Sequence, residues 1–271
     1  MIKLAEDLQE NVEDGMLYVP DGKLSIKRSE LAGNIEIESA ILPSSLSIID
    51  DESFAYTDNL KEVTCYGNIQ YIGTGAFEES GLERIEFKQG CASVNDGAFS
   101  ECTKLKEVDC KDFCNLSLGE KAFYHCEKLR SISLSNSLQE IKYGTFFKCK
   151  ELTNVWLPQS LQTLGSYAFA GCDALVSIEL PDTLKNLEDH CFDSCKNLTF
   201  VSVPAGVSVL ENKVFNRCNK LQKVELPKEL KLLDMSCFLE CGALKEITVG
   251  PDTTVTNESM TPYIIVNRLK F

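Results

Sequence analysis

The stretch SYAFAGCDALVSIELP, residues 166–181, decides the fold because its apolar residues recur along nearly the whole chain. Counting from Phe169 in both directions, a phenylalanine returns every 22 to 24 residues. From Phe99 onward, a cysteine follows each phenylalanine by three residues, and a leucine follows the cysteine by three more. A fixed period of this length is the signature of a protein built from stacked structural repeats.

The repeat consists of columns of equivalent residues, one member per copy. A β-branched residue stands three positions after each leucine, as Ile178 stands after Leu175. The phenylalanine column is Phe54, Phe77, Phe99, Phe123, Phe146, Phe169, Phe192, Phe215 and Phe238, and the cysteine column is Cys102, Cys126, Cys149, Cys172, Cys195, Cys218 and Cys241. Cys172 is therefore explained first by its place in this column, before any reactivity is considered.

Two local patterns alternate within each copy. In residues 175–181 the apolar Ile178 and Leu180 alternate with Ser177 and Glu179, which predicts a short strand with one buried face that ends at Pro181. Residues 164–172 combine glycines, small residues and one aromatic, which indicates a tight turn or a short 3-10 segment. Each copy thus predicts one strand and one turn.

One copy cannot bury its own apolar face, whereas stacked copies share a continuous core. Equivalent strands then pair in parallel about 4.8 Å apart. We therefore predict an α/β repeat solenoid over residues 31–250, with one degenerate copy followed by nine clear ones. Residues 1–30 form the predicted N-terminal cap, with a short helix over 2–14 and a hairpin around Pro20-Asp21-Gly22. Residues 251–271 form the C-terminal cap, with a closing strand over 263–271.

Composition excludes several classes of partner. The formal net charge is −14 and the chain has no run of basic residues, which argues against nucleic acid and anionic membrane surfaces. The chain also lacks an apolar run of about 18 residues, so no membrane span is expected. Its first 15 residues are rich in acidic side chains and do not resemble a secretory signal, so the chain as given is expected inside the cell unless a leader has been removed.

The 13 cysteines are predicted to be buried free thiols and not a disulfide framework. Their number is odd and seven of them occupy one repeat position, where cysteine packs as a small hydrophobe. A catalytic thiol needs a base, and the two histidines, His125 and His190, each precede a cysteine. A thiol–histidine dyad stays open at this stage, but two surface histidines are the preferred interpretation.

Three cysteine pairs have a spacing from which a metal site could begin: Cys110 and Cys114, Cys191 and Cys195, and Cys237 and Cys241. A structural zinc site closes with four ligands, and no second pair clusters with any of these in the sequence. We therefore predict no metal, no cofactor and no enzymatic activity, and a thiol- or metal-dependent enzyme is the least favoured alternative.

The copies YAFAGCDALVSIELP and GAFSECTKLKEV resemble the BspA-like, or treponemal-type, leucine-rich repeat family. The resemblance covers residues 31–250, although the asparagine column of ordinary leucine-rich repeats is replaced here by residues such as Ser160, Thr183 and Gly206. It implies a right-handed solenoid with a parallel sheet on the concave side and short turns or 3-10 segments opposite. It also implies adhesion to host matrix proteins or other cells, at the surface of a host-associated microbe or after secretion.

The outward positions of the predicted strands are the candidate binding surface, because extended solenoids present their sheet to ligands. Most of these positions carry small or charged residues, but the chain's one tryptophan, Trp156, and Phe200 also point outward. Exposed aromatics are enriched among residues that dominate binding, although single ones are common on any surface. The predicted ligand site comprises Trp156, Phe200, Glu179, Glu225, Lys223, Asn154, Ser133 and Ser202.

We therefore predict a monomeric, non-catalytic module that binds a protein ligand, either a host matrix protein or another cellular protein. The two settings, a surface adhesin and an intracellular scaffold, remain open. The extra residue in the segment 108–118 is a second candidate for function, but drift in a degenerate repeat is the simpler explanation.

Overall fold

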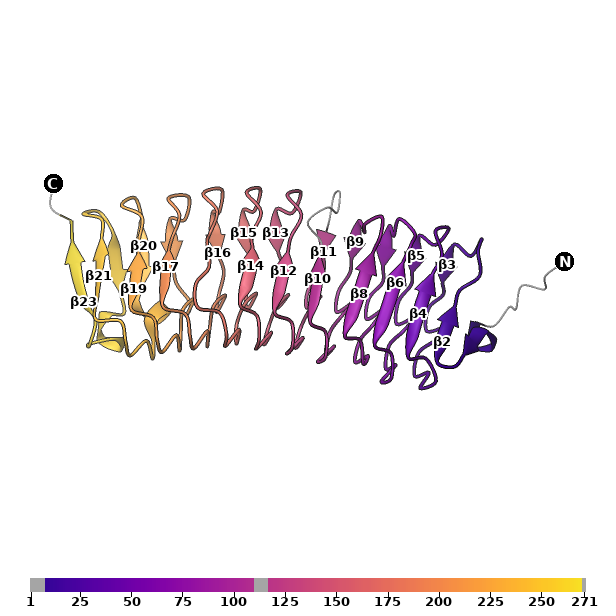
Figure 1. Ribbon diagram of the computed structural model, residues 1–271. Helices are drawn as coiled ribbons and strands as arrows, with labels where there is room; N and C mark the ends of the chain where they lie inside the picture. Colours follow the sequence, from indigo (N-terminus) through magenta and orange to yellow (C-terminus); the bar gives the residue numbers. More distant parts are fainter. Residues whose placement is uncertain (1–7, 110–116, 270–271) are drawn as a thin grey trace. The chain divides into compact units, whose positions relative to one another are not determined.

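The computed structural model describes residues 8–109 and 117–269. The chain divides into two compact units, Met1–Ser137 and Leu138–Phe271. Each unit is a stack of coils, one coil per repeat, whose strands follow one another in chain order (Figure 1). The predicted leucine-rich repeat solenoid is thus confirmed.

The first unit contains two columns of strands, which are parallel except for β1, antiparallel to β2. A 3-10 helix, η1 (Leu8–Asn11), precedes them, and the strand order is β1-β2-β4-β6-β8-β10-β12 in one column and β11-β9-β7-β5-β3 in the other. The strands are β1 (Val12–Glu13), β2 (Met16–Tyr18), β3 (Ser25–Ile26), β4 (Ser39–Leu42), β5 (Ile48–Ile49), β6 (Glu62–Cys65), β7 (Tyr71–Ile72), β8 (Arg84–Phe87), β9 (Ser93–Val94), β10 (Glu107–Asp109), β11 (Ser117–Leu118) and β12 (Ser131–Ser133).

The second unit has the same two columns but shorter ladders. Hydrogen-bonded groups there are β13-β15-β16, β17-β19, β18-β20-β22 and β21-β23. The elements are β13 (Glu140–Ile141), β14 (Asn154–Trp156), β15 (Thr163–Leu164), β16 (Asn186–Leu187), β17 (Phe200–Ser202), β18 (Val209–Leu210), β19 (Lys223–Glu225), β20 (Leu232–Asp234), η2 (Met235–Phe238), β21 (Glu246–Val249), β22 (Thr254–Thr256), η3 (Glu258–Met260) and β23 (Ile265–Arg268). The second strand column was not predicted from the sequence.

The phenylalanine column forms a continuous stack of buried rings within each unit. In the first unit, the ring centroids of Phe54 and Phe77 are 5.0 Å apart and their planes differ by 6°. In the second unit, the rings of Phe169 and Phe192 are 5.6 Å apart at 7°. One phenylalanine per coil places each ring over the equivalent ring of the next coil, so the stack joins the coils along the core.

The cysteine column satisfies backbone carbonyls beside this stack. Six thiols of the column donate a hydrogen bond to the carbonyl oxygen of the phenylalanine in the preceding coil, as from Cys195 Sγ to the oxygen of Phe169 at 3.2 Å. The other bonds of this kind are Cys102 to Phe77, Cys126 to Phe99, Cys172 to Phe146, Cys218 to Phe192 and Cys241 to Phe215, at 3.0 to 3.3 Å. Each of these carbonyls also accepts the backbone N–H three residues further along its own coil, as Phe169 does from Cys172 at 3.2 Å. The thiol therefore supplies the second hydrogen bond of the carbonyl and joins one coil to the next.

Turns, and not α-helices, connect the two strand columns in the described residues. Two left-handed residues flank each buried ring from Phe54 to Phe215, and around Phe169 these are Tyr167 (φ 58°) and Gly171 (φ 74°). An α-helix requires φ near −63°, so this alternation prevents a helical run. The predicted turns and 3-10 segments are confirmed, and the helical part of the α/β description applies only to η1, η2 and η3 among the described elements.

The predicted N-terminal hairpin is misplaced. The antiparallel hairpin consists of β1 and β2 and turns at Asp14 and Gly15, which have φ values of 47° and 79°. Around Pro20-Asp21-Gly22 the chain makes a turn instead, because β2 pairs in parallel with β4 while β3 pairs with β5 in the other column. Of the residues 2–14 predicted as a helix, the described ones form the short 3-10 helix η1 and then strand β1. Strand β23 lies within the segment predicted to close the C-terminal end.

The strand predicted over 175–181 is also wrong as a strand. Its burial alternates as expected, with Ile178 buried and Ser177 and Glu179 exposed, but its only pairing is an isolated bridge between Ser177 and Phe200. Within the described residues, no backbone hydrogen bond joins the segment 177–180 to β14 on the preceding coil. The alternation of side chains is a property of the extended chain alone, whereas a ladder also needs two backbones at pairing distance.

Candidate functional site

The outward face of β14, the segment 177–180, β17 and β19 carries seven of the eight predicted ligand residues. All seven belong to the second unit. Trp156 is 59% exposed at the end of β14, where Asn154 is also exposed. Glu179, Ser202, Lys223 and Glu225 are exposed as well, and Phe200 is half-buried. The remaining residue, Ser133, lies on β12 of the first unit and is half-buried.

Phe200, Ser202, Lys223 and Glu225 form one cluster on β17 and β19. The two strands pair in register, with Phe200 opposite Lys223 and Ser202 opposite Glu225. Lys223 Nζ lies 5.5 Å from the centroid of the Phe200 ring and 2.5 Å from Glu225 Oε1. The hydrogen bond and charge of Lys223, with a smaller contribution from the Ser202 hydroxyl, lower the pKa of Glu225. The aromatic face of Phe200 is therefore already occupied by a cation of the same chain.

Trp156 stands apart from this cluster, beside a groove of about 480 Å³. The groove lies between β14 and the segment 177–182, where the backbone ladder is interrupted. Its lining includes the polar Asn154, Ser177, Glu179 and Asp182 and contains no basic residue. The indole thus borders a hollow with an acidic lining, whereas Phe200 borders an ion pair.

Trp156 and Phe200 do not form an aromatic pair. They lie two coils apart, on β14 and β17, and the ring contacts of the described second unit do not join them. The sequence predicted both as outward residues but missed the groove between them. A signal for the groove is absent from the repeat pattern, because residues 175–181 match it as well as the strand-forming copies do.

A second hollow, of about 500 Å³, lies on the outward face of the first unit beside β8, β10 and β12. Ser133 contributes to its lining, together with Arg84, Glu86 and Lys88. Here the charges compensate one another, since Lys88 Nζ lies 2.6 Å and Arg84 Nη2 4.0 Å from carboxylate oxygens of Glu86. This hollow consequently has less unpaired charge to offer a ligand than the groove beside Trp156.

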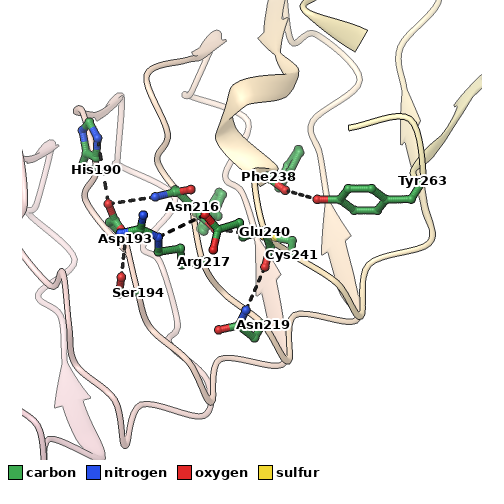
Figure 2. A network of polar contacts seen from close by, with 11 residues as sticks. His190, Asp193, Ser194, Asn216, Arg217, Asn219, Phe238, Glu240, Cys241 and Tyr263 are labelled. Carbon is green, nitrogen blue, oxygen red and sulfur yellow. Dashed lines mark hydrogen bonds and ion pairs between the residues drawn. The ribbon is translucent and has the colours of Figure 1, made fainter. Parts of the chain in front are cut away.

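The structure does not assemble a thiol–base dyad at His190. The imidazole stacks on Tyr167 with ring centroids 4.6 Å apart, and its Nε2 lies 4.0 Å from Asp193 Oδ2. Figure 2 shows Asp193 held in turn by Asn216 and Ser194, whose donors lie 3.1 and 2.7 Å from its oxygens. The neighbouring Cys191 is buried, and burial raises the pKa of its thiol. A thiolate nucleophile is disfavoured there.

The remaining thiols described by the structure resemble Cys191. All eleven described cysteines are free and buried, and burial raises the pKa of Cys102, Cys237 and Cys241 to about 12. Within the described ranges, no group of three or more potential ligands is arranged to hold a metal ion. The pair Cys110 and Cys114, with most of the segment 108–118, lies outside the described residues. Among the described elements, no helix has the length and apolar character of a membrane span.

Several solved structures of other proteins are similar in fold to this chain. Among solved structures, a leucine-rich repeat protein from Bacteroides ovatus is 21% identical, with a TM-score of 0.71 over 94% of this chain and 72% of that one. The T. pallidum leucine-rich repeat protein is 26% identical, with a TM-score of 0.51 over 84% and 86% of the two chains. A leucine-rich repeat protein from Eubacterium ventriosum is 18% identical, with a TM-score of 0.53 over 95% and 84%.

No curated protein matches the chain. The family model described as the BspA type leucine rich repeat region, in six copies, matches residues 25–153 and 140–260. These matches span most of the sequence and coincide with the columns of stacked phenylalanines and cysteines. The chain therefore belongs to the BspA-type leucine-rich repeat family.

Proposed function

We propose that this chain is a non-catalytic module that binds a protein ligand on the outward strand face of its second unit. The observation that carries the proposal is the exposed indole of Trp156 beside the groove between β14 and the segment 177–182. A tryptophan that presents this much surface to water gains more from burial against a partner than any polar neighbour on the face. Asn154, Ser202 and Glu225 supply the polar surroundings of such a contact.

Family membership suggests a setting at the surface of a host-associated microbe, where the ligand is a host matrix protein or another cell. A second candidate, an intracellular scaffold, is favoured by one observation. The eleven described cysteines are all free, as is usual for proteins in reducing compartments. The two settings differ in where the ligand comes from, so one capture experiment addresses both.

The test uses the full chain as bait, with Trp156→Ser as the variant and Tyr66→Ser as its matched control. Tyr66 is an aromatic residue in the first unit that is 46% exposed. Bait proteins are confirmed as folded by circular dichroism and offered both a cell lysate and a panel of matrix glycoproteins. We expect a partner that Tyr66→Ser retains and Trp156→Ser loses.

The source of that partner distinguishes the adhesin from the scaffold. Equal retention of every partner by both variants would overturn the placement of the site on this face. A partner lost by both variants would indicate nonspecific capture through exposed aromatics.

A further inference from the structure

The cluster formed by Phe200, Lys223 and Glu225 shows how this sheet face binds a cation. Lys223 Nζ lies over the Phe200 ring, 5.5 Å from its centroid, and within 2.5 Å of a Glu225 carboxylate oxygen. An ammonium group is attracted both by the negative face of an aromatic ring and by a carboxylate. Here the aromatic, the cation and the acid all come from one chain.

The groove beside Trp156 has the same two binding elements without the cation. Trp156 and Glu179 occupy the same repeat position as Ser202 and Glu225, on neighbouring coils 23 residues apart. Both line the groove, together with Asp182. The carboxylates that pair with described cations in the second unit include Asp173, Glu225 and Glu240. Neither Glu179 nor Asp182 has such a cation within the described residues.

We infer that the groove accepts an arginine or lysine side chain of the protein ligand, held between the Trp156 ring and the Glu179 carboxylate. Asp182 adds a second negative charge at the same groove. Tryptophan is the best of the three aromatic side chains for binding a cation. The net charge of −14 adds long-range attraction for a basic segment. This inference rests on the proposed function and specifies the chemistry that the ligand presents.

Trp156 is also the reporter for the test, since it is the only tryptophan in the chain. The probe is an acetylated, amidated tetra-arginine peptide, titrated into the full chain while tryptophan emission is followed at low and high salt. A tetra-glutamate peptide serves as the probe control. We expect saturable quenching by tetra-arginine that high salt weakens, and no change with tetra-glutamate.

Two charge-matched variants locate the binding. Glu179→Gln removes the carboxylate beside Trp156, whereas Glu229→Gln removes one exposed charge that lies outside the groove lining. Loss of one exposed ion pair or cation–π contact weakens binding about five-fold. We expect that loss for Glu179→Gln and a change below about two-fold for Glu229→Gln. Trp156→Leu, followed by calorimetry, should lose as much as Glu179→Gln.

Equal weakening by both glutamine variants would overturn the inference, because it would indicate attraction by net charge alone. Unchanged tryptophan emission at saturating peptide would overturn it as well. These failures are separable from failure of the proposed function. A captured partner that depends on Trp156 but binds Glu179→Gln normally would retain the site and exclude the basic side chain.

Discussion

Cysteine is often a catalytic or metal-binding residue, but the cysteines of this repeat form hydrogen bonds to the backbone. Six of the repeat cysteines are buried beside a phenylalanine carbonyl of the preceding coil, to which the thiol donates a hydrogen bond. Sulfur is a weak donor, and the carbonyl also accepts a backbone N–H from its own coil, so the thiol binds its second lone pair. The end of the chain supports this interpretation, since Tyr263 Oη donates to the Phe238 oxygen at 3.1 Å (Figure 2). A phenol there replaces the thiol that one further repeat would supply.

Replacing Cys195 tests this role at the scale of one residue. Cys195→Ala removes one of the two hydrogen bonds that the Phe169 carbonyl accepts, the other coming from the Cys172 N–H at 3.2 Å, and opens a small cavity, so the free energy of unfolding should fall by about 1–3 kcal/mol. Cys195→Ser keeps a hydroxyl donor at the same position and should lose less. Urea unfolding in the presence of a reductant measures both. Equal losses for the two variants would show that packing, and not the hydrogen bond, is what the thiol contributes.

At the scale of the elements, close approach of neighbouring coils restricts which residues the turns accept. Gly250 follows β21, and a Cβ atom added there would lie 1.9 Å from the carbonyl oxygen of Lys228 on the preceding coil. A backbone atom cannot move aside as a flexible side chain can. Gly242 lies in the same unit, and an added Cβ would meet no atom within 4 Å.

The two glycines make a matched pair for a stability measurement. Gly250→Ala should force the turn after β21 away from the preceding coil and reduce the free energy of unfolding by more than about 3 kcal/mol, a loss typical of severe steric conflict. Gly242→Ala should be close to neutral, or stabilising by about 0.4–1 kcal/mol because the unfolded chain loses freedom. Thermal and urea unfolding of the purified variants compare them. Similar stability of the two variants would contradict the close coil-to-coil approach at Gly250.

At the scale of the whole molecule, the buried thiols couple stability to alkaline pH. A cysteine in the unfolded chain loses its proton near pH 8.5, whereas burial raises the pKa of Cys102, Cys237 and Cys241 to about 12 in the folded protein. For a thiol whose folded pKa is raised, the stabilisation is complete below the unfolded pKa and is lost as pH rises through the folded one. Between the unfolded and the folded pKa, each such thiol lowers the free energy of unfolding by roughly 1.4 kcal/mol per pH unit.

Burial raises the pKa of nine described thiols in this way. A loss of roughly 2 kcal/mol for each by pH 10 would exceed the 5–15 kcal/mol by which native domains are stable. We therefore expect constant stability from pH 6 to 8 and cooperative unfolding between about pH 9 and 10.5, with a reductant present. Circular dichroism across this range measures the transition. A native spectrum at pH 11 would contradict the prediction.

The sequence by itself determined the repeat architecture, the identity of the core columns and the outward direction of Trp156. The repeat architecture and the core columns follow from the regular period, because equivalent residues of neighbouring coils contact one another. The outward direction of Trp156 follows from alternation, because successive side chains of an extended chain point to opposite faces. Phe54 to Phe238 and Cys102 to Cys241 could thus be assigned to the core without coordinates. The turns opposite the strands were predictable from the small residues around Phe169.

Only the tertiary structure decided the rest. The second strand column, the hairpin at Asp14 and Gly15, and the interrupted ladder at 177–180 depend on distances between backbones of different coils, which no local pattern encodes. For the same reason Phe200 was predicted as an outward aromatic like Trp156, although Lys223 of the next coil covers its ring. The groove beside Trp156 forms where two coils with ordinary repeat sequences fail to pair. Periodicity specifies which residues occupy equivalent positions. Contacts between coils decide where equivalent positions adopt different structures.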